Sequence, residues 1–210
     1  DYNGTDDASD VYPVGTTTIQ WTVTDIYGNV STCSMTVTVS DDEDPTITCP
    51  DDISQPVDMG VCEAVVIVPT PITVDNCLVD SIVNDFNSTA DASDVYPIGT
   101  TTVVWTVIDI HGNSTTCSMT ISITDDEMPT ITCPSDITQT ADAGVCEALV
   151  SIDAPMAVDN CGIASVLNDF NGTADASDVY PVGTTTVVWT VTDLAGNSEI
   201  CSMTVTITDN

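Results

Sequence analysis

Apolar and polar residues alternate along several stretches of the chain. In the stretch 184–192, T-T-T-V-V-W-T-V-T, the residues Val187, Trp189 and Val191 fall on one face, a pattern typical of a half-buried β-strand. The stretch 201–208 alternates in the same way, and its inward positions are Cys201, Met203, Val205 and Ile207. No helical period of adequate length occurs. The pattern therefore predicts an all-β fold.

The sequence repeats itself every 84 residues. The motif that starts at Asp1 returns at Asp85 and Asp169, so each step is 85 − 1 = 169 − 85 = 84 residues. Such a period is typical of tandem arrays of one structural unit. The tryptophans and cysteines follow it: Trp21, Trp105 and Trp189; Cys33, Cys117 and Cys201; Cys49 and Cys133; Cys62 and Cys146; Cys77 and Cys161.

An acidic hinge marks the boundary between repeats. The stretch 33–50 contains an alternating strand, an acidic segment and a proline that opens a second strand, and the stretch 117–134 repeats it. With the hinge as boundary, residues 43–126 and 127–210 are complete domains, whereas 1–42 is the second half of one. A half domain cannot bury its own core, so we expect the missing half upstream in a longer chain or in a neighbouring molecule.

Each complete unit contains about seven short segments with strand character, separated by turn signals. This arrangement predicts an antiparallel Greek-key sandwich. In the last unit we expect a turn at 158–162 and a loop at 179–183, where proline and glycine occur. The expected strands are 129–133, 145–152, 163–168, 184–192 and 201–208.

The charge balance is extreme. Lys and Arg are absent, Asp and Glu number 33, and the formal net charge is −33. Two carboxylates ~5 Å apart repel by roughly 3 kcal/mol at an effective dielectric near 20, so acidic clusters need water, mobile ions or bound metal. This balance excludes nucleic acid and anionic membranes as electrostatic partners.

The cysteines and the lack of apolar runs indicate the compartment. Nine regularly placed cysteines indicate disulfides and an extracellular location, either secreted or at the cell surface. No run of about 20 apolar residues exists, so we expect no membrane span. The chain begins with Asp and carries no signal peptide, so we expect a mature or excised piece.

Four motifs recur at fixed spacing. They are P-T-I-T-C-P at 45–50 and 129–134, V-D-N-C at 74–77 and 158–161, Y-P-[VI]-G-T-T-T-[VI]-x-W-T-V at 12–23, 96–107 and 180–191, and D-x-x-G-N followed by C-S-M-T-[VI] at 25–37, 109–121 and 193–205. Together they resemble the hyalin repeat (HYR) domain, an extracellular module with an immunoglobulin-like fold. The resemblance covers both complete units and the half unit. It implies a tandem array commonly linked with adhesion, and no catalysis.

Four cysteines per unit permit three disulfide pairings. We favour a bond between the first and the last cysteine, because the first and last strands are neighbours in many such sandwiches. We also favour a bond between the second and the third cysteine, because they lie at the two ends of a single segment made of one strand and its loop. Zinc is the alternative, but C-x-x-C is absent and His111 is the only histidine, which disfavours it. The expected bonds are Cys49–Cys117, Cys62–Cys77, Cys133–Cys201 and Cys146–Cys161, with Cys33 paired outside this segment.

The acidic hinges have two interpretations. A charge run is usually a solvated linker, and an Asp in the D-x-x-G-N turn often only stabilises the turn. Calcium, however, takes six to eight hard oxygen ligands, and an immunoglobulin-like fold brings the hinge, the V-D-N loop and the D-x-x-G-N turn to one end, facing the D-A-S-D loop of the preceding domain. We therefore expect structural calcium. The candidate ligands are Asp41, Asp42, Asp44, Asp75, Asp109, Asp125, Asp126, Asp159 and Asp193.

Glycan attachment is a further possibility, because several Asn-x-Ser/Thr sequons occur. The recurring sequon is the strongest candidate, since it adjoins a polar loop, and its asparagines are Asn3, Asn87 and Asn171.

The sequence favours a structural protein rather than an enzyme. The first hypothesis is a stiff extracellular stalk, filament or matrix fibre, with disulfide-stapled domains and calcium-bridged joints. Its partners would be adjoining repeats or copies of itself, assembled head to tail. The alternative is an adhesin or binding module for a glycan or a protein, or an accessory domain of a secreted enzyme.

Overall fold

The structure, a computed structural model, describes residues 4–209, and all regular elements in this range are β-strands. No helix that could cross a lipid bilayer occurs in that range. The chain divides into two compact units. The first comprises the described part of 1–49 together with 70–91 and 104–118, and the second comprises 50–69, 92–103 and 119–210.

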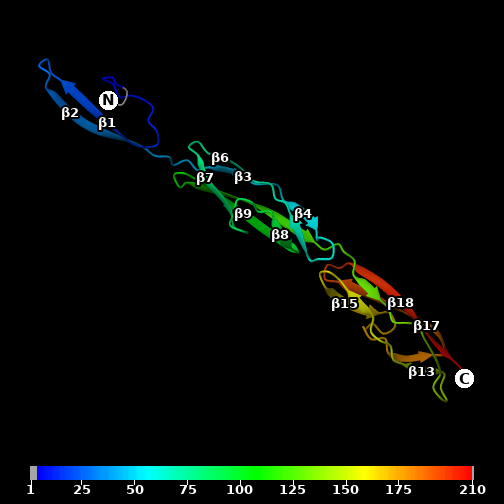
Figure 1. Ribbon diagram of the computed structural model, residues 1–210. Coiled ribbons are helices and arrows are strands. Elements are labelled where there is room, and N and C mark those ends of the chain that lie inside the picture. Colours follow the sequence, from blue (N-terminus) through cyan, green and yellow to red (C-terminus); the bar gives the residue numbers. More distant parts are fainter. Residues whose placement is uncertain (1–3, 210) are drawn as a thin grey trace. The chain divides into compact units, whose positions relative to one another are not determined.

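The repeat that ends the chain forms a β-sandwich inside the second unit (Figure 1). One sheet has the strand order β12-β18-β17-β15, and the pairs β11-β14 and β13-β16 complete the fold. These strands are β11 (Thr130–Thr132), β12 (Ile137–Thr140), β13 (Glu147–Val150), β14 (Met156–Val158), β15 (Ile163–Asn168), β16 (Asp178–Pro181), β17 (Gly183–Asp193) and β18 (Ser198–Thr208).

The all-β sandwich predicted from the sequence is confirmed, with three local differences. The strands are not all antiparallel, because β12 runs parallel to β18, with Ile137 opposite Val205. Two short strands, β12 and β14, were not expected, since three or four residues carry too little alternation to be recognised. The segment expected as a loop at 179–183 contributes β16, which pairs with β13 and ends at Pro181, a residue without an N–H for a further ladder bond.

The preceding repeat shows the same strand pairs. In the second unit, β4 runs parallel to β10, and β5 pairs antiparallel with β8. In the first unit, β3 pairs with β6 and β7 pairs with β9, both antiparallel. The strands are β3 (Thr46–Thr48), β4 (Ile53–Pro56), β5 (Glu63–Val66), β6 (Ile72–Val74), β7 (Val79–Asn84), β8 (Asp94–Pro97), β9 (Gly99–Asp109) and β10 (Ser114–Thr124).

The core of the last repeat forms as the alternation predicts. Trp189 is fully buried, and its indole N–H donates to the carbonyl of Ala174 at 3.1 Å. The Tyr180 ring stacks on Phe170 with centroids 4.4 Å apart, and its hydroxyl donates to the Ala176 carbonyl at 2.7 Å. The interpretation of Trp189 as a core residue is thus confirmed. Around it lie Ala148, Val150, Val187, Met203, Val205 and Ile207.

The first unit also contains a hairpin of β1 (Gly15–Thr24) and β2 (Val30–Val39), the equivalents of β9 and β10. Its apolar face is partly open within the described residues. Trp21 is only half-buried, whereas Trp105 and Trp189 are fully buried. Met35 is 46% exposed, whereas its equivalent Met203 is 2% exposed.

One turn position differs between the two complete repeats and allows a stability prediction. Leu78 has a φ of 140°, and the next repeat has Gly162 there with a φ of 112°. A side chain is strained at such an angle by about 1–3 kcal/mol, and Leu78 is 63% exposed, so it gains little from burial. We expect Leu78→Gly to stabilise its domain by about 1 kcal/mol in urea unfolding.

The converse change supplies the control. A Cβ at Gly162 would lie 3.3 Å from Leu194 Cδ1, so Gly162→Ala adds a tight contact to the unfavourable φ. We expect it to destabilise its domain by about 1–2 kcal/mol. If both substitutions changed the free energy of unfolding in the same direction, the explanation from backbone strain would be wrong.

Candidate metal centres

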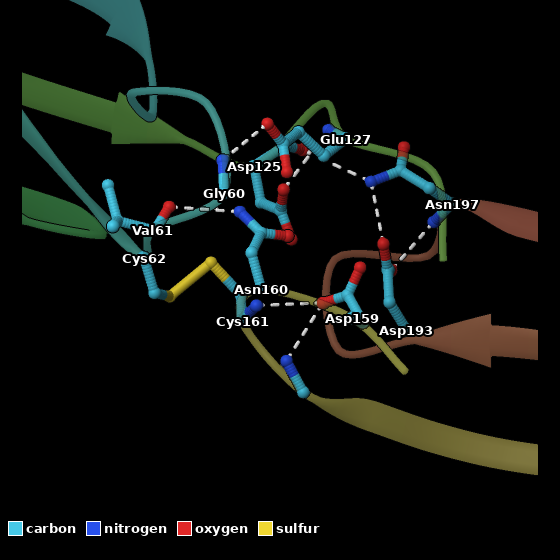
Figure 2. The surroundings of a disulfide bond; sticks show 11 residues. Gly60, Val61, Cys62, Asp125, Glu127, Asp159, Asn160, Cys161, Asp193 and Asn197 are labelled. Carbon is cyan, nitrogen blue, oxygen red and sulfur yellow. Dashed lines mark hydrogen bonds between the residues drawn. A yellow bond between two sulfur atoms is a disulfide. The ribbon is translucent and has the colours of Figure 1, made fainter. Parts of the chain in front are cut away.

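Two clusters of carboxylates form where strands end. In the first unit, Asp41 follows β2, Asp75 follows β6 and Asp109 ends β9. In the second unit, the equivalent residues Asp125, Asp159 and Asp193 meet in the same way (Figure 2). In each cluster one oxygen from each of the three residues lies within 4.8 Å of the others. The hinge, the V-D-N loop and the D-x-x-G-N turn therefore converge, as the sequence predicts.

Backbone hydrogen bonds fix the carboxylates of the second cluster. Asp159 Oδ2 accepts the N–H groups of Cys161 and Gly162, both at 2.8 Å. Asp193 Oδ1 accepts the N–H groups of Gly196 at 2.6 Å and Asn197 at 2.8 Å. The Asn197 amide binds Asp193 Oδ2 at 2.8 Å and the Asp125 carbonyl at 3.3 Å. Asn197 thus ties the turn to the hinge.

The first cluster repeats this network. Asp75 Oδ2 accepts the N–H groups of Cys77 and Leu78, both at 2.7 Å. Asn113 binds Asp109 Oδ2 at 2.7 Å and the Asp41 carbonyl at 3.3 Å. The two clusters therefore share these backbone and asparagine hydrogen bonds.

Several oxygens in the clusters are buried without a hydrogen-bond donor. In the second cluster these are Asp125 Oδ2, Asp159 Oδ1 and the neighbouring Asn160 Oδ1. In the first cluster Asp75 Oδ1 is such an oxygen. A buried acceptor without a partner costs about 1–3 kcal/mol, more when charged. Hard carboxylate and amide oxygens are ligands that Ca²⁺ prefers. The residues present therefore fit a calcium ion.

The electrostatics of the second cluster also favour a cation. Burial raises the pKa of Asp125 above its ordinary value, and the charges of Asp159 and Asp193 act in the same direction. At Asp193, burial acts to raise the pKa, but the hydrogen bonds of Asn197 and the turn N–H groups outweigh it and lower the pKa. Asp193 is thus held as an anion only 1% exposed, with no Lys or Arg in the chain to compensate it.

Three of the predicted ligands lie outside the two clusters. Asp42, Asp44 and Asp126 are exposed and belong to neither group of converging oxygens. The D-A-S-D loop, which we expected to reach the hinge from the preceding repeat, contributes no residue to the clusters among residues 4–209. In each hinge the inward aspartate, Asp41 or Asp125, also accepts the backbone N–H of the glutamate two residues later, at 3.3 and 3.1 Å.

The structure identifies three contributing side chains that the sequence analysis missed: Glu127, Asn160 and His111. Glu127 Oε1 accepts the Gly60 N–H at 2.8 Å, and the Asn160 amide donates to the Val61 carbonyl at 2.9 Å. These bonds connect the β4–β5 turn to the next repeat (Figure 2). In the first cluster, His111 Nδ1 lies 3.1 Å from Asp41 Oδ2. The period alone did not single out His111, because Ala195 takes its place in the next repeat.

The disulfides differ from the expected set in one respect. Cys49–Cys117 and Cys133–Cys201 are bonded as expected, each with a Cα–Cα separation of 5.7 Å. Cys62, however, is bonded to Cys161, with Cα atoms 4.8 Å apart.

This bond corrects two of the expected pairs, Cys62–Cys77 and Cys146–Cys161. The correction has a structural reason. The β4–β5 turn, which carries Cys62, contacts the V-D-N loop of the following repeat and not the V-D-N loop of its own repeat. Cys33, Cys77 and Cys146 carry free thiols. Hydrogen bonding to Asp41, burial and the nearby carboxylates raise the pKa of the Cys77 thiol.

The glycosylation candidates lie in a polar loop. Asn3 lies outside the described residues. The side-chain amides of Asn87 and Asn171 donate to the carbonyls of Asp91 and Asp175 at 2.9 and 3.0 Å. Their use as glycan sites stays a prediction.

Curated proteins related to this chain include two hyalins. Hyalin of Strongylocentrotus purpuratus is 34% identical over 204 residues, which is 94% of this chain and 16% of that protein. Hyalin of Lytechinus variegatus is 32% identical over 210 residues, 95% of this chain and 38% of that protein. The chain thus spans well under half the length of either relative.

Solved structures that align with this chain include cadherin ectodomains. The protocadherin gammaB4 extracellular domain aligns with a TM-score of 0.40 at 16% identity, over 91% of this chain and 37% of that one. Drosophila N-cadherin EC1-4 aligns with a TM-score of 0.39 at 13% identity, over 85% and 52%.

The family model described as HYR domain matches this chain twice, in tandem. The matched residues are 40–123 and 124–207, so each match spans one 84-residue period and together they cover most of the chain. With the hyalin relatives, these matches show that the chain belongs to the HYR domain family.

Proposed function

We propose that this chain is a segment of a stiff extracellular stalk, filament or matrix fibre in which calcium bridges the joints between HYR domains. The observation that carries the proposal is the pair of equivalent aspartate clusters, each with at least one buried carboxylate oxygen that lacks a donor. Asp41 and Asp125 follow the last strand of one repeat, while the other carboxylates belong to the next. A cation bound there would therefore attract carboxylates of two successive repeats, and so add an electrostatic connection to the covalent one of the main chain.

The residues that would hold the ion at the first joint are Asp41, Asp75 and Asp109. At the second joint they are the equivalent aspartates Asp125, Asp159 and Asp193, together with Asn160, whose Oδ1 is buried without a donor. Calcium supplies a divalent charge that neutralises the carboxylates. The chain's own part is to fix those carboxylates in advance with the turn N–H groups and Asn197, so that little ordering is needed on binding.

Disulfides and repeats support an extracellular structural role. Three disulfides in the described chain are typical of an oxidising compartment. The close similarity of the loops in successive repeats fits an array whose function is mechanical. We propose domain boundaries at 42/43 and 126/127. The partly open face of the β1–β2 hairpin supports the reading of 1–42 as half a domain that an adjoining segment completes.

Calcium removal tests the proposal. We expect calcium at about 100 times its Kd to stabilise each occupied joint by roughly 3 kcal/mol, which raises Tm by roughly 10–20 °C for domains of this size. Small-angle scattering should show a longer and more uniform particle with calcium than with a chelator, and magnesium at equal ionic strength is the control. An unchanged Tm together with an unchanged maximum dimension would refute the calcium joints.

A further inference from the structure

The Cys62–Cys161 bond joins two successive repeats in register. Its sequence separation is 99 residues, and the repeat is 84 residues long. Cys161 is therefore the equivalent of Cys77 (161 − 84 = 77), and Cys146 is the equivalent of Cys62 (62 + 84 = 146). We call each of the two bonded cysteines, with the loop around it, a half-site of the inter-repeat bond. Both half-sites recur in the chain with free thiols, at Cys77 and Cys146.

The turn around Cys146 has the conformation of the turn around Cys62. The Asp58 N–H donates to the Glu63 carbonyl at 2.8 Å, and the Asp142 N–H donates to the Glu147 carbonyl at the same distance. Gly60 and Gly144 have φ values of 78° and 84°. Both turns are therefore built to present their cysteine in the same way.

The loop around Cys77 likewise matches the loop around Cys161. In each, an aspartate side chain accepts the N–H groups of the cysteine and of the next residue, at 2.7 Å from Asp75 and at 2.8 Å from Asp159. Both kinds of half-site are thus formed before any bond closes. The chain presents one of each without its counterpart.

We propose that every HYR repeat in the full array is joined to each of its neighbours by one disulfide of the Cys62–Cys161 type. Cys77 then pairs with the equivalent of Cys62 in the preceding repeat, and Cys146 pairs with the equivalent of Cys161 in the following one. Cys33 follows the intra-repeat rule, because its equivalents Cys117 and Cys201 bond to Cys49 and Cys133. The inter-repeat bond and the intra-repeat bond together therefore give a partner to all three free thiols.

The chemistry of closure is thiol–disulfide exchange. Two thiols lose two protons and two electrons as the S–S bond forms, and a disulfide oxidant such as oxidised glutathione is reduced to two thiols. The consequence is a covalent ladder beside the main chain, in which each joint is held by the hinge and by a disulfide. This ladder rests on the tandem arrangement and holds whether or not calcium binds.

Cyanogen bromide cleavage in acid distinguishes the pairings in the chain itself. Trypsin cannot cut a chain without Lys or Arg, whereas the six methionines place Cys62 and Cys77 in fragment 60–119 and Cys161 in fragment 157–203. Low pH suppresses exchange, since the thiolate is the attacking species. We expect these two fragments to stay linked until reduction. Their separation before reduction would overturn the inter-repeat bond.

A chain extended by a second copy of residues 43–84 ahead of Asp1 tests the ladder. The copy supplies a Cys62 equivalent in phase with Cys77, so alkylation in denaturant without reductant should no longer label Cys77, and should label the copy's own Cys77 instead. Cys62→Ser in the added copy is the matched control, and it should restore labelling of Cys77. Labelling of Cys77 in the extended chain without this substitution would refute the ladder. Protection of Cys77 from alkylation only in the presence of calcium would also refute it.

Discussion

Replacing Asp75 and Asp159 together by asparagine is expected to abolish the calcium-dependent rise in Tm. In each residue Oδ2 accepts two backbone N–H groups, while Oδ1 is buried without a donor. Asparagine can keep its oxygen toward the N–H groups and place its NH₂ where the unpaired oxygen was. The change therefore removes a charge and a ligand from each cluster and preserves the turn.

The size of the effect follows from linkage. A ligand at about 100 times its Kd stabilises the folded state by roughly 3 kcal/mol per site, and each joint would lose that contribution. The measurement is Tm with calcium minus Tm with chelator, so any change in intrinsic stability cancels. Asp159→Asn alone should remove the contribution of the second joint and leave that of the first.

The matched control is Asp126→Asn. It makes the same change of charge one residue after Asp125, but its side chain is exposed and outside the cluster. We expect its calcium-dependent Tm shift to equal that of the unchanged chain. If Asp126→Asn and Asp159→Asn reduced the shift equally, the effect would be one of net charge, and the defined site would be refuted.

The sequence predicts the elements whose signal is local or periodic. Long strands such as β17 alternate over many residues, so their inward face and the buried Trp189 follow from the pattern. The convergence of Asp125, Asp159 and Asp193 follows from three motifs that flank strands of one sandwich. Four-residue strands such as β12 carry too little alternation to be recognised, and the parallel pairing of β12 with β18 depends on the assembled sheet.

Contacts between repeats are not encoded in the pattern within one repeat. The period shows that Cys62 and Cys146 are equivalent, as are Cys77 and Cys161, but it does not show whether a bond stays inside a repeat or passes to the next. Pairing within the repeat was expected because the two cysteines lie at the two ends of one strand and the loop that follows it. The position of the β4–β5 turn decides against it, and only the folded structure gives that position. Asn160 was missed for the same reason, because its amide binds Val61 of the preceding repeat.

Trp189→Ala is expected to destabilise the last domain by about 3–5 kcal/mol, the usual cost of deleting a fully buried large aromatic side chain. The indole is 0% exposed and its N–H is satisfied by Ala174, so truncation leaves both a cavity and an unpaired carbonyl. A domain with a typical total stability of about 5–15 kcal/mol would lose a large part of it. Urea unfolding followed by circular dichroism measures the change.

Trp21→Ala is the matched change in the half domain. Trp21 is only half-buried, so its removal should cost less than about 1 kcal/mol in the present chain. In the chain extended by a copy of residues 43–84, the added strands should cover the hairpin, and the same substitution should then cost about as much as Trp189→Ala. A cost that stays small in the extended chain would show that residues 1–42 do not form the second half of an HYR domain, because a completed sandwich cannot leave its central tryptophan without a packing role.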